Sequence, residues 1–153
     1  NKNIICVAPD VGGVERARAL GQKLNVGLAI VDKRRPAPGK SQVMNIIGNV
    51  KGKNCLLVDD IIDSGGTIVN AAKALKEKGA KDVYVYVTHG VLSGNAVEQI
   101  NNSKIKKLIL TDTIDNSNKI KKSSKIVVLS ISNLMAEAIK RISNSTSVSD
   151  LFK

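Results

Sequence analysis

The part of the chain that decides its fold is Cys55–Thr67, with the sequence CLLVDDIIDSGGT. It begins as an apolar run of the kind that forms a buried strand, and three aspartates, Asp59, Asp60 and Asp63, come at its end. Two glycines and a threonine follow, and after them a helical pattern begins. The segment therefore predicts a strand, a short glycine turn and the N-terminus of a helix.

The turn is suited to binding a phosphate group. A strand followed by a glycine turn and a helix start presents several backbone N–H groups to one anion. Gly65 and Gly66 let the backbone approach a ligand closely, and Ser64 and Thr67 add hydroxyl donors. The aspartates repel a phosphate, so we expect them to face sugar hydroxyls, Mg²⁺ or both. A site for a phosphorylated sugar is the favoured interpretation, and the alternative is an ordinary turn with solvated acids.

A second turn of the same kind follows the apolar run at residues 4–8. There Asp10, Gly12 and Gly13 precede a helical pattern, so the amides of this turn could take another phosphate. Asp10 is placed to hold Mg²⁺ among phosphate oxygens. Adjacent parallel strands would bring both turns to one edge of a sheet. Two anion sites beside carboxylates indicate a substrate or product that carries pyrophosphate.

The segment 33–42 has no apolar periodicity and contains two of the chain's three prolines and four positive charges. Proline, glycine and charge repulsion favour an open loop. One interpretation is a solvated surface loop without a function. Because the segment leaves directly from the end of an expected strand, we favour a basic lid that closes over a polyphosphate.

Apolar runs alternate with helical patterns along the chain. We expect strands at 4–8, 27–32, 43–48, 55–59, 83–88, 108–111 and 126–129, and helices at 13–24, 67–78, 94–100 and 132–142. Gly79 would close the second helix, and Ser132 or Asn133 would cap the last. This order predicts an α/β fold, with a parallel β-sheet flanked by helices on both faces and residues 1–153 in a single domain.

The composition narrows the range of partners. A formal net charge of +11 indicates anionic partners. Two Tyr, one Phe and no Trp argue against nucleic-acid binding by base stacking, so a solvated lysine-rich surface is favoured over a nucleic-acid patch. Without a signal peptide or a membrane-length apolar stretch, the chain is expected to be cytoplasmic, with no membrane partner.

The two cysteines and the histidine are expected to have structural roles. Cys6 and Cys55 each lie inside an apolar run and are expected to be buried thiols rather than a disulfide pair. His89 is the chain's single histidine and has no partners for a zinc site. We expect it to be a hydrogen-bonded turn residue.

The turn at 59–67 resembles the phosphoribosyl pyrophosphate loop of type I phosphoribosyltransferases, which has two acids, two apolar residues and then Asp-Ser/Thr-Gly/Ala-Gly-Thr. Further segments resemble the C-terminal half of the ribose-phosphate pyrophosphokinase family in the right order: residues 9–13, 32–36, 43–48, 88–94 and 147–152. The Lys-Arg-Arg-Pro element at 33–36 separates this family from other phosphoribosyltransferases.

The resemblance implies transfer of the pyrophosphoryl group of ATP to the anomeric hydroxyl of ribose 5-phosphate, with Mg²⁺ as cofactor. It also implies the site residues: Lys33 and Arg35 in catalysis; Asp59, Asp60, Asp63, Ser64, Gly65, Gly66 and Thr67 on ribose 5-phosphate; Asp10, Gly12 and Gly13 on pyrophosphate, with Asp10 on the metal; and Ser147 and Ser149 at an allosteric site. Family members are about twice this long and form homo-oligomers, so this chain alone is expected to be inactive or weakly active.

Two alternatives stay open at this stage. One is another type I phosphoribosyltransferase, against which the basic lid and the absence of a recognisable aromatic base pocket argue. The other is a regulatory or nucleic-acid-binding module of the same fold, which the positive charge permits. The three aspartates beside Lys33 and Arg35 make the second alternative the weaker one.

Overall fold

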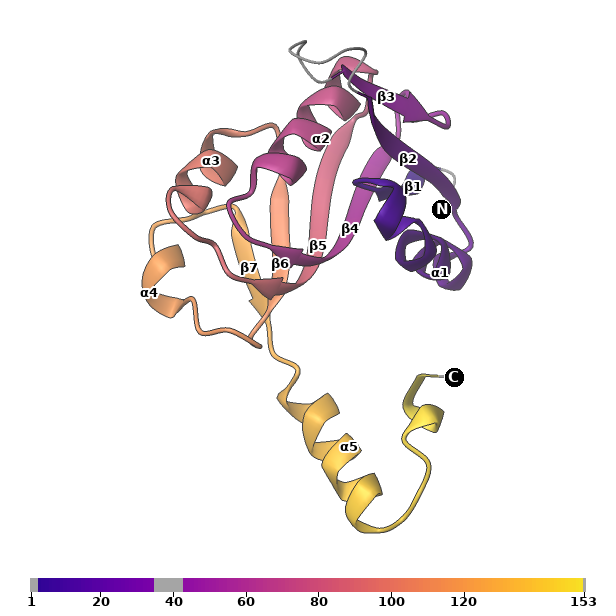
Figure 1. The fold of residues 1–153 in the computed structure, drawn as a ribbon, viewed down its shortest axis with the longest axis vertical. Helices are drawn as coiled ribbons and strands as arrows, with labels where there is room; N and C mark the ends of the chain where they lie inside the picture. The colour runs from indigo at the N-terminus through magenta and orange to yellow at the C-terminus, as the bar shows by residue number, and fades with distance from the viewer. Residues whose placement is uncertain (1–2, 35–42, 153) are drawn as a thin grey trace.

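The computed structural model describes residues 3–34 and 43–152. Seven strands form one sheet in the order β3-β2-β1-β4-β5-β6-β7 (Figure 1). The strands are β1 (Ile4–Ala8), β2 (Gly27–Arg34), β3 (Val43–Ile47), β4 (Asn54–Ile62), β5 (Asp82–Gly90), β6 (Lys107–Thr111) and β7 (Ile126–Leu129). The helices are α1 (Val14–Leu24), α2 (Gly66–Glu77), α3 (Ala96–Asn102), α4 (Ser117–Ile120) and α5 (Ser132–Ser143), with 3-10 turns η1 (Val11–Gly13) and η2 (Ser149–Phe152).

The predicted α/β class is confirmed, and the sheet is mostly parallel. The exception is β3, which pairs antiparallel with β2, from Ile30 opposite Ile47 to Arg34 opposite Val43. The expected parallel pairing is therefore confirmed except at this edge. A parallel return needs a crossover of a dozen or more residues. Only residues 35–42 separate β2 from β3, which suits a hairpin-like return.

Helices cover both faces of the sheet, as expected. Successive strand residues point to opposite faces. Val7 and Leu57 pack into a core that includes the buried side chains of α2, whereas Ala8 and Val58 pack with Ala17 of α1. Helices α1 and α2 accordingly lie on opposite sides of the sheet (Figure 1).

The connections leave a crevice between β1 and β4. These two strands are parallel neighbours, with Val7 opposite Leu57. From β1 the chain goes through α1 to β2, and from β4 it goes through α2 to β5, in the opposite direction along the sheet. Such a reversal is where ligands bind in open α/β sheets, at the carboxyl ends of the strands. The fold therefore places both predicted turns at its most favourable ligand position.

Several element ends differ from the sequence-based expectations. Strands β2, β4 and β5 run further than expected, so Lys33 and His89 lie within strands, and the short helix α4 was not expected. The cap of α5 is Ile131 instead of Ser132 or Asn133. The backbone N–H groups at the start of α5 have partners outside the helix. The Ile131 N–H donates to Asp112 Oδ1, and the Ser132 N–H donates to Ser130 Oγ. Both cysteines are free and buried, as expected.

The last helix stands apart from the sheet. Figure 1 shows α5 projecting away from the β-sheet, and none of its residues is buried. Its apolar side chains Leu134, Met135, Ile139 and Ile142 are exposed. Within residues 3–34 and 43–152, no helix has the length and apolar character needed to span a membrane.

Candidate active site

A hollow of about 230 Å³ lies at the carboxyl ends of β1 and β4. Asp10 contributes from the turn after β1, Asp59 from β4, and the remaining lining comes from residues 61–68. The structure thus brings together one aspartate of the first turn and nearly the whole acid-and-glycine segment of the second. Three residues expected at the same site do not line this hollow: Asp60, Gly12 and Gly13.

The glycine turn has the shape that the sequence predicted. Gly65 caps α2 with φ 84°, a left-handed conformation that favours glycine, and Gly66 begins the helix. The first N–H groups of a helix have no partners within it, and the helix dipole adds a partial positive charge there. Ser64 and Thr67 are both exposed and line the hollow. This end of α2 can therefore accept a phosphate group.

The turn after β1 forms η1, with Asp10 as its cap. Asp10 Oδ1 accepts a hydrogen bond of 3.1 Å from the Gly13 N–H, and Asp10 Oδ2 lies 3.9 Å from Lys33 Nζ. Lys33 belongs to β2, so this first residue of the loop predicted at 33–42 lies in a strand instead. The rest of that loop, including the expected catalytic residue Arg35, lies outside the described residues.

Arg16 of α1 joins the acid pair at the end of β4. Its Nη1 lies 3.0 Å from Asp59 Oδ1, and its Nη2 lies 2.7 Å from Asp60 Oδ2. Burial raises the pKa of the Asp59 carboxyl, and the charge of Arg16 opposes that rise. Burial acts in the same direction on Asp60, but Arg16 and hydrogen bonds outweigh it and lower the pKa of that carboxyl.

Sequence reasoning gave Arg16 no role, although one signal could have found it. Arg16 lies in the first turn of α1, where the helix dipole disfavours a positive charge. A cation at that position indicates a specific anionic partner. The adjacent Asp59 and Asp60, at the end of a neighbouring strand, are the partners that the fold supplies.

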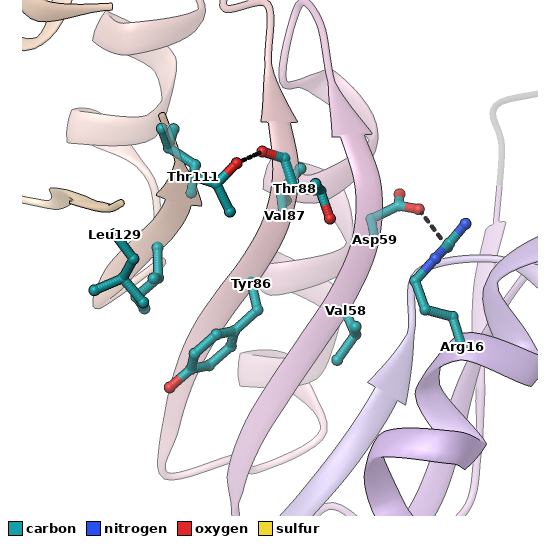
Figure 2. Close-up of a pocket in the computed structure, with 10 residues that line it drawn as sticks. Arg16, Val58, Asp59, Tyr86, Val87, Thr88, Thr111 and Leu129 are labelled. Carbon is teal, nitrogen blue, oxygen red and sulfur yellow. Dashed lines mark hydrogen bonds and ion pairs between the residues drawn. The ribbon is translucent and has the colours of Figure 1, made fainter. Parts of the chain in front are cut away.

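A second hollow, of about 280 Å³, adjoins this acid pair (Figure 2). Its lining includes Arg16, Asp59, Tyr86 and Thr111. His89 lies near the same end of β5, and its Nδ1 is 2.9 Å from Thr113 Oγ1, so the expected hydrogen bond is confirmed. The expected turn position is wrong, because His89 belongs to the strand. Asp59 belongs to both hollows, which makes it the carboxylate that connects them.

The comparisons with known proteins agree with this geometry. Residues 33–153 match the family model described as the phosphoribosyl synthetase-associated domain. The chain belongs to the ribose-phosphate pyrophosphokinase family. The family member from Hyphomonas neptunium is 60% identical over 152 residues, which cover 99% of this chain and 49% of the relative. The chain thus spans about half the length of the curated relatives it matches.

A solved structure supports the same family, and a second supports the fold. The phosphoribosylpyrophosphate synthetase from Mycobacterium smegmatis superposes with a TM-score of 0.84 at 37% identity, over 94% of this chain and 46% of that one. APRTase from Giardia lamblia is 18% identical with a TM-score of 0.57, over 71% of this chain and 68% of that one. This second likeness concerns the fold alone.

The carboxylates of the hollow fit a divalent cation that is held mainly by substrate oxygens. Among the described residues, no group of three or more His, Cys, Asp or Glu side chains could hold a metal ion by itself. Mg²⁺ commonly takes one or two carboxylates and completes its shell with substrate oxygens and water. Asp10 and Asp59 line one open hollow, which matches that requirement.

The two tail serines lie away from both hollows. Ser147 follows α5, and its carbonyl oxygen accepts a hydrogen bond of 2.9 Å from Arg141 Nη1. Ser149 begins η2. The Phe152 carbonyl of this turn accepts from Lys23 Nζ at 2.9 Å, which ties the tail to α1. An allosteric role for these serines stays a prediction.

Proposed function

We propose that this chain supplies the ribose 5-phosphate site and the catalytic strand end of a ribose-phosphate pyrophosphokinase. The complete enzyme would transfer the pyrophosphoryl group of ATP to the anomeric hydroxyl of ribose 5-phosphate, giving phosphoribosyl pyrophosphate and AMP. The observation that carries the proposal is the shared hollow of Asp10, Asp59 and the turn at 63–67, at the β1–β4 crevice. Membership of the family supports the same reaction.

The sugar phosphate would bind with its two ends on different groups. The residues from Asp63 to Thr67 would receive the 5-phosphate through backbone N–H groups and hydroxyls. Asp59 and Asp60 would accept hydrogen bonds from ribose hydroxyls, directly or through Mg²⁺. This division keeps the carboxylates of Asp59 and Asp60 on the neutral part of the ligand and the helix N-terminus on its charged part.

Phosphoryl transfer depends mainly on positioning and on stabilising negative charge. Lys33 would supply positive charge to the transferring group, with Arg35 as its partner. Gly12 and Gly13 would offer backbone amides to pyrophosphate. Lys33 Nζ lies 3.9 Å from Asp10 Oδ2, so the lysine charge neighbours the proposed metal ligand. When bound at Asp10, Mg²⁺ would neutralise charge on phosphate oxygens.

The proposal also covers the setting of the reaction. The complete protein would be a cytoplasmic homo-oligomer, with this chain as one domain and Ser147 and Ser149 near a regulatory site. The resemblance of the tail at 147–152 to the family supports that placement.

The test follows the chain by phosphorus NMR with Mg²⁺, ATP and ribose 5-phosphate. A shift of the ribose 5-phosphate signal without turnover is expected. Asp59→Asn should weaken the shift, whereas Asp82→Asn, the same change at the amino end of β5, should leave it unchanged. Resonances of AMP and phosphoribosyl pyrophosphate would show a complete active site in this chain. No shift with the unsubstituted chain would contradict the proposal.

Lys33→Ala separates catalysis from binding. Because Lys33 is assigned to the transferring group, its removal should leave the affinity for ribose 5-phosphate within about threefold. In the complete enzyme, turnover should fall by more than about a hundredfold. A Lys33→Ala chain that keeps its turnover but loses ribose 5-phosphate binding would contradict the assigned role.

A further inference from the structure

One guanidinium group spans both carboxylates of the acid pair Asp59 and Asp60. Arg16 Nη1 contacts Asp59 Oδ1 at 3.0 Å and Arg16 Nη2 contacts Asp60 Oδ2 at 2.7 Å. Figure 2 shows the Arg16 side chain reaching from α1 towards the end of β4, with the contact to Asp59 drawn as a dashed line. The planar fork of arginine, unlike the single ammonium of lysine, can hold two acceptors in a fixed geometry.

The contacts link the two turns of the candidate site. Arg16 follows the Asp10 turn in sequence, and the acid pair precedes the phosphate turn at 63–67. The contacts therefore join Arg16 to residues that lie 43 and 44 positions further along the chain. Arg16 is also the cation that the dipole of α1 disfavours. Its position is therefore explained by the acid pair and not by the stability of its own helix.

The acid pair creates an electrostatic difficulty for an anionic ligand. Two carboxylates next to a phosphate turn repel a sugar phosphate, the more so because Asp59 is only 17% exposed and poorly screened. A fixed positive charge between them reduces that repulsion. The shortest contacts with Arg16 engage Oδ1 of Asp59 and Oδ2 of Asp60, and every carboxylate has a second oxygen that can accept from a hydroxyl.

We propose that Arg16 is a positioning residue of the sugar-phosphate site, which holds Asp59 and Asp60 in place and offsets their charge when a phosphorylated sugar binds. The inference rests on the proposed function, because it takes ribose 5-phosphate as the ligand. The inference adds Arg16 to the residues of the sugar-phosphate site. Arg16 acts through the two aspartates, so its loss affects affinity by way of charge and orientation.

The test measures ribose 5-phosphate affinity by titration calorimetry for the unsubstituted chain, Arg16→Gln, Arg16→Lys and Arg18→Gln. Arg18 is exposed on the same helix and lines a different hollow, so Arg18→Gln is a matched change of charge. Arg16→Gln should weaken binding at least about tenfold, because charge-assisted contacts are lost. Arg16→Lys should recover part of the loss, and Arg18→Gln should stay within about twofold.

Salt separates the charge effect from a general structural one. The deficit of Arg16→Gln relative to the unsubstituted chain should shrink between about 0.05 M and about 0.5 M salt, because screening weakens the repulsion by the acid pair. A deficit that salt does not change and lysine does not relieve would overturn the inference, and so would equal affinity of Arg16→Gln and the unsubstituted chain. Absence of binding by the unsubstituted chain would instead overturn the proposed function, and the inference with it.

Discussion

At the scale of single residues, Gly79 shows where backbone conformation restricts the sequence. It follows α2 with φ 86°, and the Ala80 N–H donates to the Leu75 carbonyl, which closes the helix. Gly79→Ala should lower the free energy of unfolding by about 1–2 kcal/mol, because a side chain disfavours left-handed backbone. Urea unfolding measures this loss of unfolding free energy. Gly66→Ala is the control, since a Cβ there meets no atom within 4 Å and φ is ordinary, and an equal loss in both variants would contradict the prediction.

At the scale of elements, α2 and α5 differ in what their apolar side chains contact. Leu75 of α2 is fully buried against the sheet, whereas Ile139 of α5 is 62% exposed. Leu75→Ala should cost about 2–5 kcal/mol of unfolding free energy, because it leaves a cavity in the core. Ile139→Ala should change it by less than about 0.5 kcal/mol. Denaturant unfolding of both variants checks this, and comparable losses would mean that α5 is packed in solution.

At the scale of the whole molecule, acid should destabilise the fold. The pKa values of Asp60, Asp82, Asp112 and Asp115 are all lowered in the folded chain. A carboxyl with a lowered folded-state pKa contributes stability above its unfolded-state pKa, of about 3.9, and loses it as the pH falls through the folded-state value. Thermal unfolding midpoints should therefore drop from about pH 5 towards pH 3.

The net charge of +11 strengthens this trend, because protonating carboxylates leaves still more unbalanced positive charge. Asp82→Asn is the informative variant, since its pKa is lowered chiefly by a hydrogen bond from Lys106. That variant should lose less stability between pH 5 and pH 3 than the unsubstituted chain. A midpoint that rises on acidification would contradict the prediction.

Local patterns were enough to predict most elements of the fold. Strands β1, β4 and β7 and helix α2 follow from apolar runs and glycine positions, which act over a few residues. The α/β class follows from their alternation. Strand ends were less predictable: β4 continues beyond the expected end at Asp59, because pairing with β5 satisfies its backbone as far as Ile62. That pairing is a tertiary contact.

The sequence by itself determined the glycine turn, the acids beside it and the family, because these depend on residue types in a continuous stretch. The tertiary structure confirmed that Asp10 and Asp59 lie in one hollow, as the expected pairing of parallel strands implied. Only the tertiary structure decided the antiparallel edge of β3 and the contacts of Arg16 with the acid pair. Each of these depends on which distant segments become neighbours. Such neighbours are set when whole helices and strands pack together, and no local sequence pattern predicts them.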